Sequence, residues 1–144
     1  VGSYWHGHIY VNAELSPFQV NGPDAQNYAA VMDMYANEGD PRDTFGQGGY
    51  LSARFFVDMM MGMDPAMVDD RAAVSDAIRG ITGYTSDLMC GPYYVGDADF
   101  HMPNHAGYMV RIVEGGFEIV RDCYEFDSPF FAPLIALEEE LGLR

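Results

Sequence analysis

Hydrophobic and polar residues follow two different periods along this chain. At the start, an aromatic and histidine-rich segment, residues 4–8, leads into the apolar run Ile9-Tyr10-Val11. A run of β-branched and aromatic residues predicts a strand that ends in the polar loop after Val11. On such a strand, His6 and His8 would lie on the same face. The pattern therefore predicts a strand with aromatic and imidazole side chains gathered at its start.

The helical period begins after the turn Asn21-Gly22-Pro23-Asp24. Proline and aspartate both suit the first turn of a helix, so we expect a helix over residues 24–37. Its apolar positions follow the i, i+3, i+4, i+7 spacing of one helix face: Tyr28, Val31, Met32 and Tyr35. A second helix is predicted over residues 43–61. Because its apolar positions cover much of its circumference, we expect it to be largely buried.

Shorter elements follow the break at Asp64-Pro65. An amphipathic helix is predicted up to Gly80, and a strand over residues 89–95. Residues 108–113 and 117–120 predict a hairpin with glycines in its turn. A polar loop at 96–107 carries His101 and His105, and a short acidic helix is predicted around 134–141. This order of strand, helices, strands and helix is typical of the α/β class.

Composition and charge exclude several classes of partner. The chain is 49% hydrophobic and 14% aromatic, which favours a folded domain over disorder. Its net charge is -15, and it contains no lysine. Because contacts to phosphate require lysine or arginine, we expect no nucleic-acid partner and no anionic membrane partner. No run of about 18 apolar residues is present, so no transmembrane helix is predicted.

The glycine-rich and cysteine-containing segments predict no catalysis. The segment 46–49, Gly-Gln-Gly-Gly, is neither preceded by a strand nor followed by the lysine of a phosphate loop. We interpret it as small residues at the start of a tightly packed helix. Cys90 has no charged neighbour that would lower its pKa, so no catalytic role is predicted.

Histidine and acidic residues raise the question of a metal site. His6, His8, His101 and His105, with Asp97 and Asp99, match no zinc-binding spacing. Ordinary hydrogen-bonding histidines are the better interpretation, and we predict no metal and no cofactor. Tyr4 and Trp5 leave two alternatives open: they belong to the core, or they form the wall of a ligand pocket.

The order and spacing of several segments resemble the type I periplasmic binding proteins of the leucine/isoleucine/valine-binding family. These are solute receptors of ABC transporters, and the resemblance extends over nearly the whole chain. The resembling segments are Gly7-His8-Ile9-Tyr10-Val11, the helix with Tyr28 and Tyr35, Gly49-Tyr50-Leu51-Ser52-Ala53, the Asp64-Pro65 helix, Met89-Cys90-Gly91-Pro92-Tyr93 and the 110–120 hairpin.

The resemblance implies a fold of two Rossmann-like α/β lobes with the ligand bound between them. Residues 1–38 and 101–144 would belong to lobe two, and residues 39–100 to lobe one. The chain would be a C-terminal fragment contributing to both lobes, and it would expose apolar surface that a dimer partner could cover. Cys90 would lie in lobe one and Cys123 in lobe two, so a disulfide between them would tether the hinge.

The resemblance also implies a ligand site at Tyr4, Trp5 and His6. Amino-acid binders of this family have an acidic residue where this chain has His6. A neutral imidazole lacks the charge that an ammonium group prefers, which favours an aromatic acid, an amide or another small polar molecule. We expect His6 to donate a hydrogen bond to the ligand.

Three functions follow from these observations. The first is the solute-binding component of an ABC transporter, exported to the periplasm or cell surface, with a membrane permease as its partner and no enzymatic activity. The second is a ligand-sensing regulatory domain of the same fold, similar to an amide sensor. The third is a hydrolase that uses the histidine-rich edge.

Overall fold

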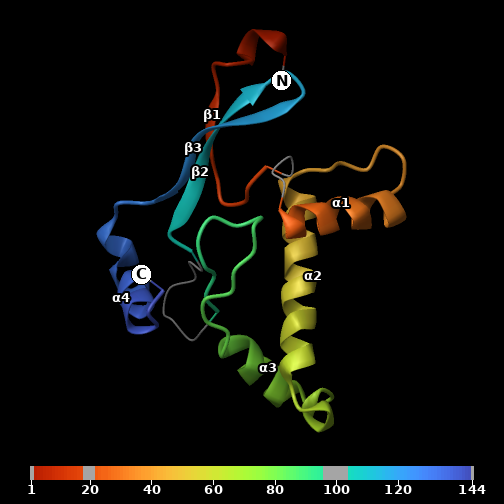
Figure 1. Cartoon of the computed structure of the whole chain (residues 1–144), viewed down its shortest axis with the longest axis vertical. Helices are drawn as coiled ribbons and strands as arrows, with labels where there is room; N and C mark the ends of the chain where they lie inside the picture. Colours follow the sequence, from red (N-terminus) through yellow and green to blue (C-terminus); the bar gives the residue numbers. More distant parts are fainter. Residues whose placement is uncertain (1, 18–21, 96–103, 144) are drawn as a thin grey trace.

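The computed structural model describes residues 2–17, 22–95 and 104–143. Within these residues, a three-stranded sheet lies beside a group of helices (Figure 1). The elements are η1 (Ser3–Trp5), β1 (Tyr10–Ala13), α1 (Pro23–Tyr35), α2 (Thr44–Gly62), η2 (Pro65–Met67), α3 (Arg71–Arg79), β2 (Ala106–Val113), β3 (Gly116–Glu125), η3 (Pro129–Phe131) and α4 (Ala132–Glu140). The mixture of helix and sheet agrees with the predicted α/β class.

The sheet has the order β1-β2-β3 and is antiparallel throughout. Val11 of β1 lies opposite Val110 of β2, and Val110 lies opposite Ile119 of β3. The predicted hairpin is confirmed, and the turn contains Gly115 at a φ of +80°, a conformation that favours glycine. The division into two lobes stays a prediction.

Aspartate side chains fix the starts of the helices. At α1, the Asp87 carboxylate accepts the backbone N–H groups of Asp24 and Ala25 at 2.8 and 3.1 Å. At α2, Asp43 accepts the N–H of Gly46 at 2.9 Å. These bonds satisfy N–H groups that have no partner inside the helix. The predicted helices at 24–37, 43–61 and before Gly80 are therefore confirmed, each with small shifts at its ends.

The prediction that the second helix is largely buried is wrong. Of the α2 residues, Gln47 and Leu51 are buried, whereas Phe45 is 90% exposed and Met61 82% exposed. The described elements cover only the face of α2 that carries Leu51. On α1, Tyr28 is buried but Tyr35 is 75% exposed, so the apolar face predicted for that helix is covered only in part.

A non-helical segment, residues 84–95, joins two hydrophobic clusters. One cluster contains Ala25, Tyr28, Leu51, Leu88 and Met89, and the other contains Cys90, Ala106, Tyr108 and Val110. Figure 1 shows this segment between the sheet and α2. Cys90 forms a disulfide with Cys123 of β3, with a Cα–Cα separation of 5.4 Å. The segment is therefore fastened to the sheet by a covalent bond.

Two further sequence predictions are corrected here. Residues 89–95 form no strand: the segment makes only isolated bridges, Leu15 with Met89 and Tyr84 with Tyr93. Gly91, at a φ of +77°, and the following Pro92 interrupt an extended ladder. The expected polar loop 96–107 ends earlier than predicted, because His105 is buried and β2 begins at Ala106. Residues 96–103, including Asp97, Asp99 and His101, lie outside the described residues.

The start of the chain is also less extended than predicted. Residues Ser3–Trp5 form a short 3-10 helix, and regular β pairing begins only at Tyr10. His6 and His8 therefore do not alternate along a strand. No helix among the described residues has the length and apolar character needed to cross a membrane.

Candidate functional site

An apolar cavity of about 490 Å³ lies among α2, α3, the two residues that follow β1 and the segment 84–95. This volume falls within the range of small-molecule sites. The lining residues are Glu14, Leu15, Gly48, Leu51, Ser52, Phe55, Phe56, Ile78, Tyr84, Met89, Tyr93 and Val95. Most of these side chains are apolar or aromatic, as is typical of sites for organic ligands.

One face of α2 forms the longest wall of the apolar cavity. Gly48, Leu51, Ser52 and Phe55 follow the i, i+3, i+4, i+7 spacing that places side chains on a single helix face. Gly48 adds no side chain to this wall, and the nearest atom to a Cβ built at that position is the Leu15 side chain at 4.0 Å. At Gly46, two residues earlier, a Cβ would lie 2.7 Å from the Tyr28 hydroxyl, whereas at Gly49 nothing lies within 4 Å, so the predicted tight packing at the start of this helix holds at Gly46 alone among these three glycines.

Two tyrosines form the opposite wall. Tyr84 and Tyr93 exchange backbone hydrogen bonds of 2.9 and 2.8 Å, an isolated antiparallel bridge. The Tyr84 ring meets the Phe55 ring edge-on, with centroids 5.0 Å apart. The Tyr84 hydroxyl donates to Asp58 at 3.1 Å. Backbone pairing therefore holds the two tyrosines opposite each other in the bridge, and the contacts with Phe55 and Asp58 orient the Tyr84 ring.

The polar groups of the apolar cavity lie at its edge. The Tyr93 hydroxyl donates to the Glu14 carboxylate at 3.3 Å. Burial raises the pKa of Tyr93 far above its usual value, and the neighbouring Glu14 raises it further. Burial and the hydrogen bond to Asp58 also raise the pKa of Tyr84. Both phenols therefore stay neutral at neutral pH, and Glu14 places a carboxylate beside an otherwise apolar site.

The sequence-predicted site residues lie elsewhere. Tyr4, Trp5 and His6 belong to the 3-10 helix η1 and its C-terminal cap, beside the end of the sheet that carries the β2–β3 turn (Figure 1). Tyr4 is 77% exposed, and its ring meets Trp5 edge-on with centroids 5.1 Å apart. The rings of Tyr4 and Trp5 are in contact and exposed, and the half-buried His6 follows them in the chain; we call these three residues the N-terminal aromatic cluster. None of the three lines the apolar cavity.

Sequence analysis missed Glu14, Tyr84 and Tyr93. A usable signal was the spacing of Gly48, Leu51, Ser52 and Phe55, which lies inside the helix that the sequence predicts to be largely buried. Tyr84 and Tyr93 gave no periodic signal, because a single bridge holds them rather than a regular strand.

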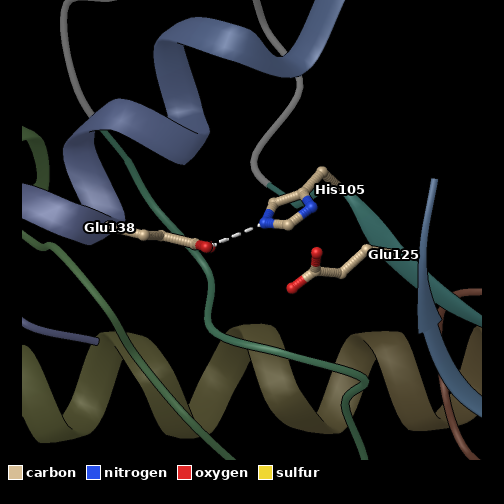
Figure 2. Close-up of side chains that lie close together, drawn as sticks. All are labelled: His105, Glu125 and Glu138. Carbon is tan, nitrogen blue, oxygen red and sulfur yellow. Dashed lines mark hydrogen bonds and ion pairs between the residues drawn. The ribbon is translucent and has the colours of Figure 1, made fainter. Parts of the chain in front are cut away.

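A second group of polar residues is buried near α4. The Nε2 atom of His105 lies 2.9 Å from both carboxylate oxygens of Glu138 (Figure 2). Figure 2 also shows the Glu125 carboxylate turned toward the imidazole ring. One potential metal-ligand atom from each of these three residues lies within 4.8 Å of the other two. His6 and His8, by contrast, lie on the N-terminal turn of chain and are not part of this group.

The comparisons with known proteins give one match. A family model described as periplasmic binding protein matches residues 2–116. The chain belongs to the periplasmic binding protein family. No curated protein and no solved structure matches this chain.

Membership of the periplasmic binding protein family limits the range of functions to consider. The family implies binding of a small molecule and a periplasmic location, and its members are generally not enzymes. The matched residues 2–116 include both the apolar cavity and the N-terminal aromatic cluster. The family therefore supports a solute-binding role without choosing between the two surfaces.

Proposed function

We propose that this protein is the solute-binding component of an ABC transporter of the leucine/isoleucine/valine-binding type, and that its ligand binds in the apolar cavity. The observation that supports this most directly is the cavity's composition. Aromatic side chains from α2 and from the segment 84–95 face each other, and Glu14 stands at the edge. Such a site suits a small organic molecule with an apolar or aromatic body and one polar end.

Glu14 indicates which chemical group the polar end of the ligand carries. A carboxylate stabilises an ammonium or a hydrogen-bond donor, and this charge-assisted bond is stronger than a neutral one. Glu14 therefore supplies the negative charge that His6 lacks. We infer that the ligand carries an amine or amide group, which includes aromatic amino acids and aryl amides.

The predicted ligand contacts at Tyr4, Trp5 and His6 form the second candidate surface. Its aromatic rings are exposed, and the Tyr4 ring also lies 6.2 Å from the ring of His8. Exposed rings can stack on a planar ligand, but they remove little of its surface from water. The apolar cavity is the better candidate because burial of apolar surface supplies most of the binding free energy.

The predicted lobes relate the apolar cavity to the family architecture. Under that division, Glu14 and Leu15 come from lobe two, whereas α2, α3 and the segment 84–95 come from lobe one. The cavity would then lie at the boundary between the lobes. The membrane permease remains the proposed partner, and the exposed apolar residues of α2 remain the proposed surface for a dimer.

The disulfide supports an exported receptor over a cytoplasmic regulatory sensor of the same fold. Cys90 and Cys123 are bonded, and disulfides persist in oxidising compartments such as the periplasm. Under the predicted division, the bond would join lobe one to lobe two and tether the hinge between them.

A thermal-shift screen tests the proposed function. The purified protein is heated with a panel of aliphatic amino acids, aromatic amino acids, aryl amides and aromatic acids at increasing concentration. A ligand that binds only the native state raises the melting temperature in a concentration-dependent way. We expect aromatic amines or amides to give the largest shifts. A panel without any concentration-dependent shift would contradict the proposal.

A further inference from the structure

A second site is formed by residues from three elements that are far apart in the sequence. His105 directly precedes β2, Glu125 ends β3, and Glu138 lies in α4. Their potential ligand atoms lie within 4.8 Å of one another. Glu125 is exposed, whereas His105 and Glu138 are each only 3% exposed. The group is thus buried on one side and open to solvent on the other.

The imidazole of His105 gives an independent indication of a ligand. Its Nε2 atom lies 2.9 Å from both oxygens of Glu138, and a ring nitrogen that donates to a carboxylate carries the proton. In a neutral ring, Nδ1 then holds a lone pair. This buried Nδ1 atom has no hydrogen-bond partner among the residues that the structure describes. Buried polar atoms are nearly always partnered, so the exception calls for an explanation.

We propose that His105 and Glu125, with Glu138 behind the imidazole, form a site for a divalent transition-metal ion of the zinc type. The cation takes the lone pair of His105 Nδ1 and an oxygen of Glu125, while Glu138 accepts the proton of Nε2 and holds the ring in this tautomer. Imidazole favours Zn²⁺ and its neighbours over Ca²⁺ and Mg²⁺, which prefer sites built only from oxygen. Two carboxylates and a neutral imidazole carry two negative charges, which a divalent ion neutralises. A buried carboxylate such as Glu138 gains most from this neutralisation.

The geometry of the site requires only small movements. Zinc–ligand bonds of about 2.0–2.1 Å in a tetrahedron place neighbouring ligand atoms about 3.3 Å apart. The 2.9 Å contact between His105 Nε2 and Glu138 stays as it is, because the ion binds at the other ring nitrogen. The ligand atom of the exposed Glu125 side chain lies within 4.8 Å of those of His105 and Glu138. A cavity of about 390 Å³, lined by all three residues, leaves room for water molecules as the remaining ligands.

Metal binding has a structural consequence for α4. The site connects this helix to the ends of β2 and β3, beside the ring contact between His105 and Phe131. A cation that binds only the native arrangement therefore stabilises the docking of α4 against the sheet. This role is separate from the apolar cavity, because the two sites share no lining residue.

Isothermal titration calorimetry tests the proposal. The protein is stripped of metal by a chelator, dialysed, and titrated at neutral pH with ZnCl₂, and in separate runs with CaCl₂ and MgCl₂. We expect one Zn²⁺ per chain, and much weaker binding of Ca²⁺ and Mg²⁺. Glu125→Gln should weaken Zn²⁺ binding by at least about tenfold. Glu139→Gln on α4 removes the same charge from an exposed neighbouring position and should bind like the wild type.

Further measurements serve as controls and can contradict the proposal. Glu125 is exposed, so its variant should fold, and circular dichroism will verify this. A double variant, His6→Ala with His8→Ala, tests whether Zn²⁺ instead binds at the N-terminal histidines. Equal Zn²⁺ affinity in Glu125→Gln and Glu139→Gln, or loss of binding in the double histidine variant, would overturn the proposal, as would a wild type that binds no Zn²⁺. A visible absorption band of the Co²⁺-loaded protein that disappears in His105→Asn would support it.

Discussion

The apolar cavity and the N-terminal aromatic cluster contain similar residue types but arise in different ways. Tyr4, Trp5 and His6 are neighbours in sequence, and the backbone bonds of Ser3–Trp5 and the following turn hold them locally. The apolar cavity is assembled from residue 14, one face of α2, Ile78 and the segment 84–95. The first group is largely exposed, and the second lines a half-open cavity. A group of functional residues that are neighbours in sequence is thus easy to recognise from the sequence. A cavity, by contrast, depends on contacts between residues that are distant in sequence.

The largest expected effect comes from the disulfide that fastens one wall of the apolar cavity. Reduction of Cys90–Cys123, which closes a separation of 33 residues, should lower the free energy of unfolding. The chain-entropy model gives about 3–4 kcal/mol for such a loop. Urea unfolding with and without reductant measures the difference.

The matched control for the disulfide is the double variant Cys90→Ala with Cys123→Ala. Reductant should not change its stability. If the wild type also unfolds at the same urea concentration with and without reductant, the covalent fastening of the cavity wall contributes nothing to stability, contrary to this account.

The next effect concerns ligand affinity. Phe55→Ala removes an aromatic ring that faces Tyr84 in the apolar cavity, and truncation of a buried aromatic contact weakens binding by about tenfold or more. Calorimetry with the best ligand from the thermal-shift screen measures the change. Phe45→Ala is the control, because Phe45 lies on the same helix but is 90% exposed. Similar affinities for these two variants would place the ligand outside the cavity.

A smaller effect is expected at alkaline pH. Burial raises the pKa of Tyr93 in the folded state, so the folded protein keeps this proton while the unfolded chain loses it. Stability should therefore fall as the pH rises above about 10, the ordinary value for tyrosine. Chemical unfolding at a series of pH values should show a shallower alkaline loss in Tyr93→Phe. Tyr35→Phe, at an exposed position on α1, should keep the slope of the wild type.

The smallest effect is predicted at the N-terminal aromatic cluster. Trp5 is the only tryptophan and is 49% exposed, so its fluorescence reports on this cluster alone. Saturation of the protein with ligand should leave the emission maximum unchanged, and Trp5→Ala should alter stability by no more than about 0.5 kcal/mol. A blue shift of the emission on ligand addition would favour the cluster as the binding site.

Local signals in the sequence predicted much of the fold. Asp43, Pro23 and Gly115 mark ends of elements through capping and turn chemistry, and these effects act within a few residues. The segment 89–95 was mistaken for a strand because its apolar residues satisfy the pattern of a strand. Continuous pairing with a neighbouring strand is interrupted at Gly91 and Pro92. Local periodicity does not encode such long-range pairing.

The candidate sites were harder to predict for the same physical reason. Glu14 and Tyr93 meet across a separation of 79 residues, and His105 and Glu138 across 33. Neither pair shares a motif. The histidines were weighed for metal binding with nearby aspartates, whereas the carboxylates that face His105 come from β3 and α4.

A crystal structure of the protein with its ligand from the thermal-shift screen tests the central claim most directly. We predict that electron density for the ligand lies between α2 and the segment 84–95, with its aromatic body against Phe55 and Tyr84 and its polar end at Glu14. Ligand density against Tyr4 and Trp5, with the apolar cavity filled only by water, would contradict the account.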